Sequence, residues 1–598
     1  MIQYIKKILY LLPKGDSVKL VLLFFMMLLA AVLEVAGIGM IPAFVSIVAD
    51  PDQVMQFAPI ERLLATLGIT TSRELLIWGG VTLVLVFVIK NLYLVAYFYV
   101  EARYTYSRFY QIAHRLMSSY MQAPYTFHLQ RNSAELLRNA NQEVRLIVQQ
   151  VMKPLLIAAK ESVMVTGILL FLLILEPIIT LVTFALLGSS VGLFLMLTQK
   201  RMKRYGLEEQ KHRRGMIKAL NQGVGGIKDA RILNREADFI EQFRHAAFRS
   251  SKLLTIQNFL AKIPKPMVET IAVGGMMLIA VLMVVQGRPV SAIIPVLTLF
   301  AMATVRLMPA IQQITSAVTK IRYNMVTIEP IYDDIRELSE YRKRFLADRD
   351  QHEQLSMQHN LDAENVHYSY PNSEEQALRG VSFAISRGSS VAFTGPSGSG
   401  KTTIVDLLLG LLEPKKGEIR VDGKNIHDHL SGWQRNIGYI PQFIYLADET
   451  LRSNIAFGIP DKEIEDEKVW QAIRLAQLDE LVHRLPKGLD TMIGERGTRL
   501  SGGQRQRVGI ARALYHEPDV LVMDEATSAL DNIVEKQIIE AIEVLKGERT
   551  IIMIAHRLTT VMNCDHIYLL DNGKIKTEGS YSGLIDSSEQ FRAMAMEE

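Results

Sequence analysis

Long apolar runs alternate with segments rich in basic residues along the N-terminal half of the chain. An α-helix needs about 20 mostly apolar residues to cross the hydrocarbon core of a bilayer, and each run reaches about this length. The pattern therefore predicts an α-helical membrane domain with six spans. The predicted spans cover residues 18–48, 75–100, 153–175, 178–198, 266–287 and 290–318.

The segments between the spans predict how the spans are oriented. Arg and Lys are frequent in residues 101–152 and 199–265, and Lys6 precedes the first span. Because positively charged loops stay on the cytoplasmic side, we expect these segments and the N-terminus there. The first span is longer than a signal peptide and lacks a small-residue cleavage site, so it should remain in the mature protein. Short connections near Glu176 and Gly287 are then outer turns, and the long inner segments predict helices that continue into the cytosol.

Beyond the last span the chain is charged and contains no further run of spanning length. Short strand-like apolar runs alternate there with amphipathic stretches, which is typical of an α/β domain. The stretch that precedes them is rich in charged residues and Gln and predicts a solvated linker. We expect a transmembrane domain over residues 1–335, a linker over 336–358 and an α/β domain over 359–598, with strands at 390–394, 437–440, 520–523 and 550–554.

Composition narrows the class of protein. Of the 598 residues, 49% are hydrophobic and 21% are charged, and the net charge is only +4. Disordered proteins and proteins that coat nucleic acid are more polar and more strongly charged, so a membrane protein without a nucleic-acid partner is expected. The single cysteine, Cys564, cannot form an internal disulfide, which fits a reducing cytosolic face.

The strongest motif is GPSGSGKT, which runs from Gly395 to Thr402 between the strand 390–394 and an apolar helical pattern at 404–412. This is the context that a P-loop requires, whereas a plain glycine-rich turn needs none of it. Backbone N–H groups at the helix start bind phosphate oxygens, Lys401 reaches the β- and γ-phosphates and the Thr402 hydroxyl binds Mg²⁺. We therefore expect ATP and Mg²⁺ to bind. The candidate ATP-binding residues here are Gly395, Ser397, Gly398, Gly400, Lys401, Thr402 and Thr403.

Asp524 and Glu525 follow the apolar strand 520–523. A buried parallel strand would deliver this pair of carboxylates to the phosphate side of the sheet. We expect Asp524 to hold Mg²⁺ through water and Glu525 to polarise the attacking water as a general base. Alone, such a pair is more often an ordinary strand end, but the P-loop upstream reverses that weighing.

The stretch LSGGQ, from Leu500 to Gln504, lies just upstream of Asp524, and its Ser-Gly-Gly predicts a second anion-binding helix start. With these motifs the chain resembles the ATP-binding cassette (ABC) proteins over essentially its whole length. Six spans before one cassette resemble a half-transporter of the ABC exporter fold. In that family this signature contacts the γ-phosphate held by the other cassette, so the resemblance implies a homodimer with two composite sites. It implies ATP-binding roles for Ser501, Gly502, Gly503 and Gln504.

Further residues match the family motifs one by one. Tyr370 resembles the aromatic residue that stacks on adenine, and Gln442 resembles the loop glutamine that contacts Mg²⁺ and water. His556 resembles the switch histidine that contacts the γ-phosphate. Asp531 ends a stretch similar to the loop that is exchanged across the cassette dimer. The resemblance thus implies catalytic roles for Glu525, His556 and Gln442, metal binding by Thr402, Gln442 and Asp524, and ATP binding by Tyr370 and Asp531.

Two inner segments, 123–135 and 223–232, fall where the family places its coupling helices, although ordinary turns between long helices would look the same. Gly494 to Gly497 resembles a short loop found in exporters. The resemblance implies an ATPase that drives transport. An ATP-gated channel is a different class with the same architecture, and ion flux at saturating ATP would distinguish the two.

Four charged residues, Glu34, Lys90, Glu269 and Arg306, lie within predicted spans. Charges inside a membrane are costly and mark either internal pairs or a cavity. Glu34 and Lys90 can form such a pair. Alternatively, Lys90 and Arg306 line a cavity and attract a phosphorylated head group.

The sequence around Glu34, the span that contains Lys90, and residues 306–310 resemble the membrane domain of bacterial flippases for lipid-linked oligosaccharides. That family uses basic cavity residues to bind the pyrophosphate of a polyprenyl-linked glycan. The resemblance implies an exporter of such a glycolipid in the bacterial inner membrane, with substrate contacts at Lys90, Arg306 and Glu34. An amphipathic helix expected at 59–67 would contact the lipid tail or simply cap the bundle. A broad lipid, peptide or multidrug exporter is the alternative.

Overall fold

The computed structural model describes residues 2–13, 15–49, 51, 71–285, 290–349, 354–525, 540, 543–555 and 557–596. The chain divides into two compact units. All the secondary structure described in the first unit is helical, and the second unit holds two β-sheets. The first unit comprises Met1–Met121 and Asn132–Ser339, and the second comprises Gln122–Arg131 and Glu340–Glu598.

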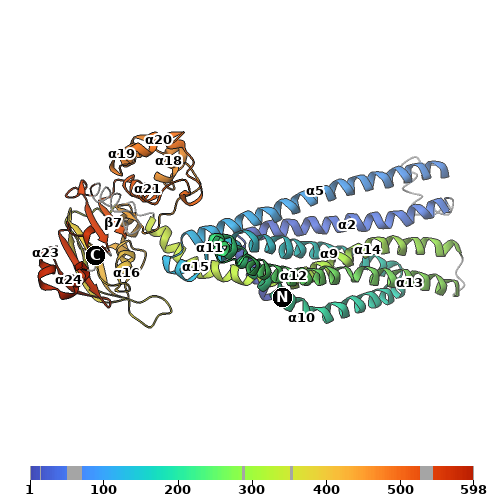
Figure 1. Ribbon diagram of the computed structural model, residues 1–598. Helices are drawn as coiled ribbons and strands as arrows, with labels where there is room; N and C mark the ends of the chain where they lie inside the picture. The colour runs from blue at the N-terminus through green and yellow to red at the C-terminus, as the bar shows by residue number, and fades with distance from the viewer. Residues whose placement is uncertain are drawn as a thin grey trace. The chain divides into compact units, whose positions relative to one another are not determined.

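Long helices make up the first unit, and Figure 1 shows them running alongside one another. Helix α2 packs on α5, α9 packs on α14, and α10 packs on α12. The linker predicted at 336–358 is helical in its first part, because α15 extends as far as Arg349. The helices are α1 (Ile2–Leu11), α2 (Asp16–Ala49), α5 (Ser72–Met121), α7 (Ser133–Arg138), η1 (Asn139–Glu143), α8 (Val144–Leu146), η2 (Ile147–Met152), α9 (Lys153–Leu175), α10 (Pro177–Gly225), α11 (Ile227–Ile232), α12 (Glu236–Lys262), α13 (Pro264–Val285), α14 (Val290–Asn324), η3 (Met325–Thr327) and α15 (Ile328–Arg349).

Five helical stretches of the described chain are long and apolar enough to cross a membrane, and five predicted spans overlap them. The remaining predicted span, 266–287, falls on the apolar 22-residue helix α13. The outer helix expected at 59–67 and the outer turn near Gly287 lie outside the described residues. The five stretches are Asp16–Val48, Ser72–Met121, Ser133–Leu175, Pro177–Gly225 and Val296–Leu346.

A buried ion pair fixes the start of α2 to α5. Arg108 Nη1 lies 2.9 Å from Asp16 Oδ1, and the two side chains are only 2% and 4% exposed. The Tyr104 hydroxyl donates to Asp16 Oδ2 at 2.8 Å, and the Arg108 guanidinium lies 4.7 Å from the Tyr104 ring centroid. Asp16 also occupies the first turn of α2, where a carboxylate interacts favourably with the helix dipole. The Asp16 carboxylate thus fixes the start of α2 against α5.

Buried hydrogen bonds join α5, η1 and α15. The Tyr120 hydroxyl donates to Asp334 Oδ2 at 2.5 Å, and Asn139 Nδ2 donates to both groups at 3.3 Å. All three side chains are at most 4% exposed. Because unpaired polar groups are costly in such surroundings, these bonds fix the relative register of the three elements.

A neighbouring group of buried charges continues across the first unit to α10. Arg213 Nη2 donates to both carboxylate oxygens of Glu143, at 3.1 and 3.2 Å. Arg138 Nε lies 3.5 Å from Glu143 Oε1, and Arg213 Nη1 lies 3.7 Å from Glu209 Oε2. Glu143 is only 1% exposed. Helix α10 also approaches the end of α14 closely, since a Cβ on Gly206 would lie 2.0 Å from the Tyr323 carbonyl oxygen.

The second unit is built on a six-stranded sheet in the order β10-β9-β3-β8-β7-β6 and a four-stranded antiparallel sheet in the order β2-β1-β4-β5. Five strands of the larger sheet, β9, β3, β8, β7 and the edge strand β6, are parallel. All four strands predicted from the sequence are present as β3, β6, β7 and β8. The strands are β1 (Asn360–Tyr368), β2 (Leu378–Ser386), β3 (Ser390–Thr394), β4 (Lys416–Val421), β5 (Lys424–Asn425), β6 (Ile437–Ile440), β7 (Val520–Asp524), β8 (Thr550–Ile554), β9 (His566–Asp571) and β10 (Lys574–Gly579).

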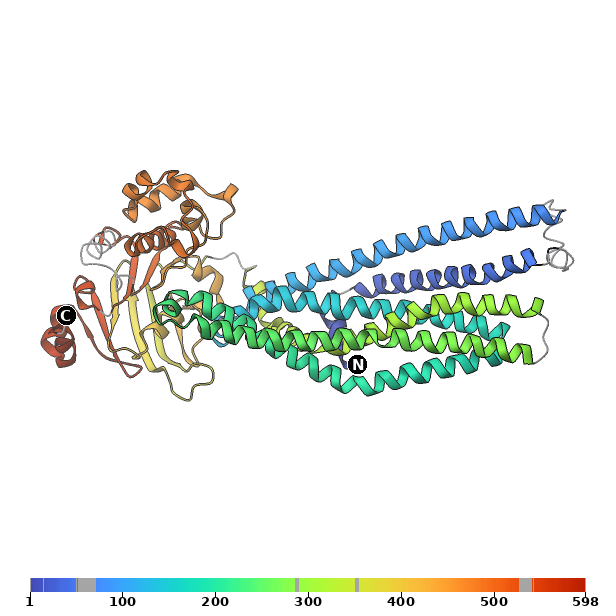
Figure 2. The same ribbon diagram turned by 45° about the vertical axis from the view of Figure 1, so that its right-hand side comes forward.

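Helices of the second unit lie around these sheets, and α18 to α21, orange in Figure 2, gather in a separate lobe. The short helix α6 belongs to this unit although its sequence lies between α5 and α7. The helices are α6 (Tyr125–Gln130), α16 (Lys401–Leu408), η4 (Ile426–Asp428), α17 (Leu430–Gln434), α18 (Leu451–Ile455), η5 (Asp461–Glu463), α19 (Asp466–Leu475), α20 (Asp479–Arg484), η6 (Gly488–Asp490), η7 (Glu495–Gly497), α21 (Gly502–Leu514), η8 (Leu558–Thr560), α23 (Tyr581–Ser587) and α24 (Glu589–Met596).

The substitution Asp16→Ala should destabilise the first unit strongly. It leaves the Arg108 guanidinium buried without its carboxylate, which costs about 3–5 kcal/mol. Thermal unfolding of the full chain in lipid nanodiscs measures the effect. The matched control is Glu241→Ala, because Glu241 pairs with Arg244 on the solvent-exposed face of α12 and should change the midpoint little. Equal midpoints for the two variants would contradict the anchoring role of Asp16.

Candidate functional site

The P-loop connects β3 to α16, as its sequence predicts. Gly395 has φ +143°, and a Cβ there would lie 2.1 Å from the Leu570 carbonyl oxygen. Gly400 precedes α16 with φ +106° and has no room for a side chain beside Leu378. Ser397 and Gly398 are exposed at the tip of the loop. The glycines therefore allow a tight backbone turn whose N–H groups are available at the start of α16.

Lys401 is buried at the centre of this loop. It is 5% exposed, and its Nζ donates to the carbonyl oxygens of Gly395 and Pro396 at 2.8 and 2.9 Å. Burial lowers the pKa of Lys401, and the carboxylates of Glu525 and Asp524 oppose that shift. The ammonium group thus lies beside the loop, where phosphate oxygens can take over its contacts.

Two hydroxyls beside Lys401 fit a phosphate-bearing ligand. Among the described residues, Thr394 Oγ1 and Ser399 Oγ are buried atoms without a hydrogen-bond partner. Buried hydroxyls normally form hydrogen bonds. Two unbonded hydroxyls next to the N–H groups of the P-loop therefore indicate a binding site for a ligand with acceptor oxygens, such as phosphate. Thr402 lies in the first turn of α16 next to Lys401. The loop therefore has the hydrogen-bond donors that can bind the phosphates of a nucleoside triphosphate.

The two predicted carboxylates lie at the end of β7. Asp524 is 8% exposed, and its pKa is raised by burial and then by the charge of Glu525. Glu525 adopts φ +47°, a left-handed conformation that is uncommon outside glycine and gathers at functional sites. Its N–H donates to the Ile554 carbonyl oxygen of β8 at 3.0 Å. This hydrogen bond holds the Glu525 backbone beside β8, directly after the end of β7.

Gln442 meets Glu525 directly. Its Nε2 donates to Glu525 Oε2 at 2.5 Å. The contact follows from topology, because Gln442 comes just after β6, and β6 pairs with β7 in parallel. The sequence predicts both residues in the site but not this hydrogen bond between them.

The arrangement fits Mg²⁺ only in combination with phosphate. The described residues contain no group of three or more His, Cys, Asp or Glu that could hold a metal alone. Mg²⁺ is commonly bound by one or two carboxylates together with substrate phosphates. Asp524, the Gln442 amide oxygen and the Thr402 hydroxyl are the groups that would complete such a set. When bound with ATP, the ion would neutralise charge that develops on the phosphates.

Tyr370 is linked to the P-loop helix. Its hydroxyl lies 3.0 Å from Thr403 Oγ1, and its ring makes an edge contact with Tyr368 at 5.2 Å between centroids. The predicted adenine platform and the P-loop are therefore held together by one hydrogen bond.

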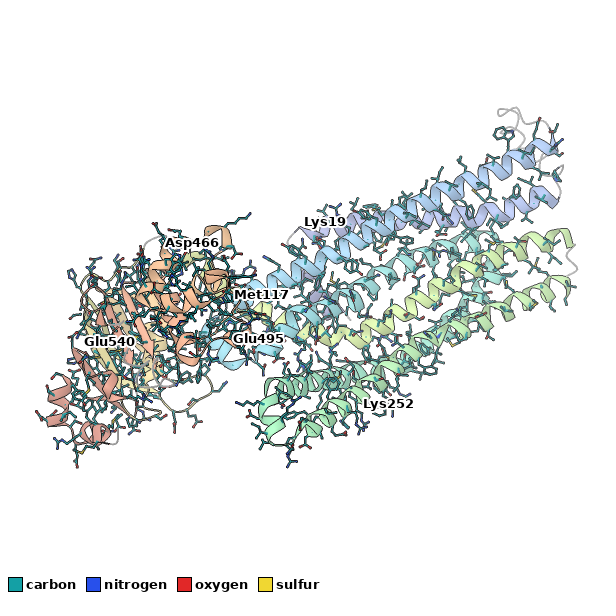
Figure 3. The ribbon with its side chains drawn as sticks, turned by 45° about the horizontal axis from the view of Figure 1, so that its top comes forward. Lys19, Met117, Lys252, Asp466, Glu495 and Glu540 are labelled. Carbon is teal, nitrogen blue, oxygen red and sulfur yellow. The ribbon has the colours of Figure 1, made fainter. Side chains whose placement is uncertain are left out.

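The signature forms the start of α21. Ser501 is the N-cap, its Oγ accepts from the Gln504 N–H at 3.3 Å, and Gln504 Oε1 accepts from the Ser501 N–H at 2.9 Å. Ser501 and Gly502 are exposed, and a Cβ on Gly502 would meet nothing within 4 Å. The capping box satisfies part of the helix start and presents the Ser-Gly-Gly backbone outward, with Gly503 in the first turn. Glu495 of the preceding loop, labelled in Figure 3, begins η7.

Three residues of the second unit with notable surroundings are not among the site residues predicted from the sequence. Asp406 lies on α16, and its pKa is raised to about 6 by burial and then by Asp524. Burial raises the pKa of Tyr125 in α6, with a further contribution from Asp406, so α6 reaches the surroundings of the P-loop helix. Arg512 of α21 donates to the carbonyl oxygens of Tyr445 and Asn454, both at 2.8 Å. Neither a buried acid in a helix nor an arginine after a signature is distinctive in sequence.

The charged residues of the spans form one cluster. Glu34 Oε1 lies 3.1 Å from Arg306 Nη2, and Glu34 Oε2 lies 3.5 Å from Lys90 Nζ. The side chains of Glu34, Lys90 and Arg306 are 9%, 10% and 28% exposed. Glu269 lies on α13 and is exposed. The internal pair considered from the sequence, Glu34 with Lys90, is present, and Arg306 joins it. Asp531 and His556 lie outside the described residues.

Comparisons with known proteins agree with this architecture. Residues 20–308 match the ABC transporter transmembrane region, and residues 378–528 match the ABC transporter family. An ATP-dependent lipid A-core flippase of Cupriavidus metallidurans is 31% identical over 467 residues, which cover 78% of this chain and 77% of that protein. The corresponding flippase of Pasteurella multocida is 30% identical over 475 residues and covers 79% and 80%.

A solved structure of a bacterial Atm1-family ABC exporter with ATP bound superposes with a TM-score of 0.73, at 23% identity, and covers 96% of this chain and 98% of that one. That likeness establishes a shared fold. Together with the P-loop, the carboxylates at β7 and the signature helix, these matches show that the chain belongs to the ABC transporter family and is an ATP-hydrolysing translocase of the exporter type, with one membrane domain and one cassette.

Proposed function

We propose that the chain acts as a homodimeric flippase that uses ATP hydrolysis to move a lipid with a phosphorylated, glycan-bearing head group across the bacterial inner membrane. A polyprenyl-diphosphate-linked oligosaccharide is the substrate that we favour. The cluster of Glu34, Lys90 and Arg306 carries the proposal, because it leaves one positive charge in excess among three helices of the spans. Such a charge is expensive unless an anion joins it.

The chemistry of the cluster suits phosphate. Arg306 presents a planar set of donors that matches two phosphate oxygens, and Lys90 adds a compact cation. The relatives named above act on a lipid according to their names, which supports a lipid as the class of substrate. A protein that moves such a lipid needs an apolar surface for the tail and cationic groups for the charged head group, and the spans offer both.

The mechanism that we propose for hydrolysis uses the residues at the end of β7. Glu525 accepts a proton from water as the water attacks the γ-phosphate, and Gln442 holds the Glu525 carboxylate in place. Lys401 and the N–H groups of the P-loop stabilise the charge that develops on the phosphate oxygens. Asp524 and Thr402 are the proposed Mg²⁺ residues, with Gln442 as a third.

Each ATP site is proposed to be completed by a second copy of the chain. Ser501 and Gly502 are exposed at the start of α21, and together with Gly503 and Gln504 they would contact the nucleotide bound at the P-loop of the second copy. Tyr370 is proposed to stack on the adenine, His556 to contact the γ-phosphate and Asp531 to reach across the dimer. The N-terminus and the cassette would both lie in the cytoplasm.

The substitution Glu525→Gln should abolish turnover while ATP still binds. The amide keeps the contact with Gln442 but cannot accept a proton from water, so we expect at least a hundredfold loss of steady-state ATPase, in line with the usual weight of general-base catalysis. Phosphate release and ATP trapping measure the two properties. Glu480→Gln, on the exposed surface of α20, is the control. Turnover near the wild-type rate would refute the role of Glu525.

Mixed dimers test the composite site. A chain with Ser501→Arg and a chain with Lys401→Ala are each expected to be inactive as homodimers, because every site then lacks one half. In the mixed dimer one site keeps both an intact P-loop and an intact signature. Co-reconstitution should therefore restore part of the ATPase activity. If the mixture hydrolyses no more ATP than either variant alone, the proposal of independently working composite sites is wrong.

Neutralising the whole cluster tests the substrate. In the variant Glu34→Gln with Lys90→Gln and Arg306→Gln no buried charge is left without a partner, whereas changing only the two cations would strand the Glu34 carboxylate. Two charge-assisted contacts are worth about 1.5–3 kcal/mol each. We therefore expect at least a tenfold fall in diphosphate-linked glycolipid moved per ATP hydrolysed in proteoliposomes.

The paired change Glu241→Gln with Arg244→Gln, on the exposed face of α12, is the control for the loss of an ion pair. A stable neutral-cluster variant that flips the glycolipid normally would contradict the phosphate-binding role and favour a broad exporter.

A further inference from the structure

Glu34 is the only described acid within ion-pair distance of Lys90 and Arg306, and each of its oxygens faces a different cation. The three residues come from α2, α5 and α14. Glu34 and Lys90 are almost fully buried, and the Arg306 side chain is 28% exposed. One carboxylate therefore joins three helices and neutralises one of two positive charges.

The two cations keep bonding capacity that Glu34 does not use. Arg306 offers five N–H donors, of which Nη2 faces Glu34, while its buried Nε has no hydrogen-bond partner. Lys90 lies 3.5 Å from the carboxylate, beyond the length of a strong charge-assisted bond, and its ammonium stands 4.3 Å from the Phe87 ring centroid. An anion with more oxygens and more charge than a carboxylate would satisfy both cations better.

Helix α2 contains two glycines and a proline within about two turns after Glu34. Gly37 lies one turn after Glu34 and faces Lys90, since a Cβ there would be in ordinary contact, 3.6 Å from Lys90 Cδ. Gly39 follows, and Pro42 lies inside α2. Glycine weakens a helix interior, and proline removes a backbone hydrogen bond and bends the helix. The part of α2 that follows Glu34 is therefore less rigid than an unbroken helix.

We propose that Glu34 is a resident counter-ion that occupies the phosphate-binding position and is exchanged for the anionic head group of the substrate, an inference that rests on the proposed function. Before substrate arrives, Glu34 makes two buried cations tolerable and ties α2 to α5 and α14. A diphosphate displaces the carboxylate, takes over Lys90 and Arg306, and removes the tie that Glu34 makes from α2 to the other two helices. The displaced Glu34 side chain takes up a proton, because an ionised carboxylate without a partner is not stable among the spans. A neutral lipid cannot replace the Glu34 carboxylate, so Glu34 restricts binding at Lys90 and Arg306 to lipids with an anionic head group.

Geranylgeranyl diphosphate and the uncharged geranylgeraniol are the probes for this exchange. The full chain is placed in nanodiscs of zwitterionic lipid, and the thermal midpoint is followed as each probe is titrated. Glu34→Gln should lower the midpoint without probe, because two cations then lack a counter-ion. It should also lower the half-saturating diphosphate concentration at least tenfold, because the competitor is gone. Glu34→Asp keeps the charge and should stay within about threefold of the wild type.

The outcomes separate the two proposals. If the wild type responds to the diphosphate more than to the alcohol, but Glu34→Gln binds it equally or more weakly, then Glu34 is a structural clamp and the counter-ion proposal is overturned while the phosphate site stands. If neither protein distinguishes the diphosphate from the alcohol, there is no anion site and both proposals are overturned. A lower midpoint together with tighter diphosphate binding supports the exchange, since loss of a structural contact alone would not sharpen binding.

Discussion

A charge buried among apolar helices must keep an opposite charge beside it, and this requirement governs the helical unit of the protein. Asp16 pairs with Arg108 at the start of α2, Glu143 pairs with Arg213 between η1 and α10, and Glu34 faces its two cations within the spans. Breaking such a pair strands a charge, so each one fixes the relative position of the helices that it joins. The Glu34 cluster differs from the others because its charges do not balance.

The same principle applies at the cassette. Lys401 is held by carbonyl oxygens of its own loop, and Glu525 is held by Gln442. These internal contacts are ones that phosphate oxygens and water can replace when ATP binds. The proposed substrate site and the ATP site thus share one feature: in both, charged groups lie against partners from the chain itself, which a ligand would replace. Exchange of this kind would let binding alter helix contacts while the buried cations keep an acceptor or an opposite charge beside them.

Motifs with a fixed backbone requirement were predictable from the sequence, and contacts between distant residues were not. The P-loop, the strand before Asp524 and the helix start at Ser501 depend on local order of glycine, apolar and capping residues, and all three are present. The bond between Gln442 and Glu525 depends on the pairing of β6 with β7, which the sequence does not specify. Likewise, the order of residues allowed Glu34 to pair with Lys90, but the addition of Arg306 requires α14 to pack on α2.

The most direct measurement is ATP-driven lipid movement by the wild-type chain alone in proteoliposomes. Two fluorescent substrates with the same polyprenyl tail and the same glycan are compared, one joined through a diphosphate and one through a neutral glycosidic bond. We expect ATP with Mg²⁺ to move the diphosphate-linked lipid between leaflets and to leave the neutral lipid in place. Equal movement of both lipids, or movement of the neutral lipid only, would contradict this expectation.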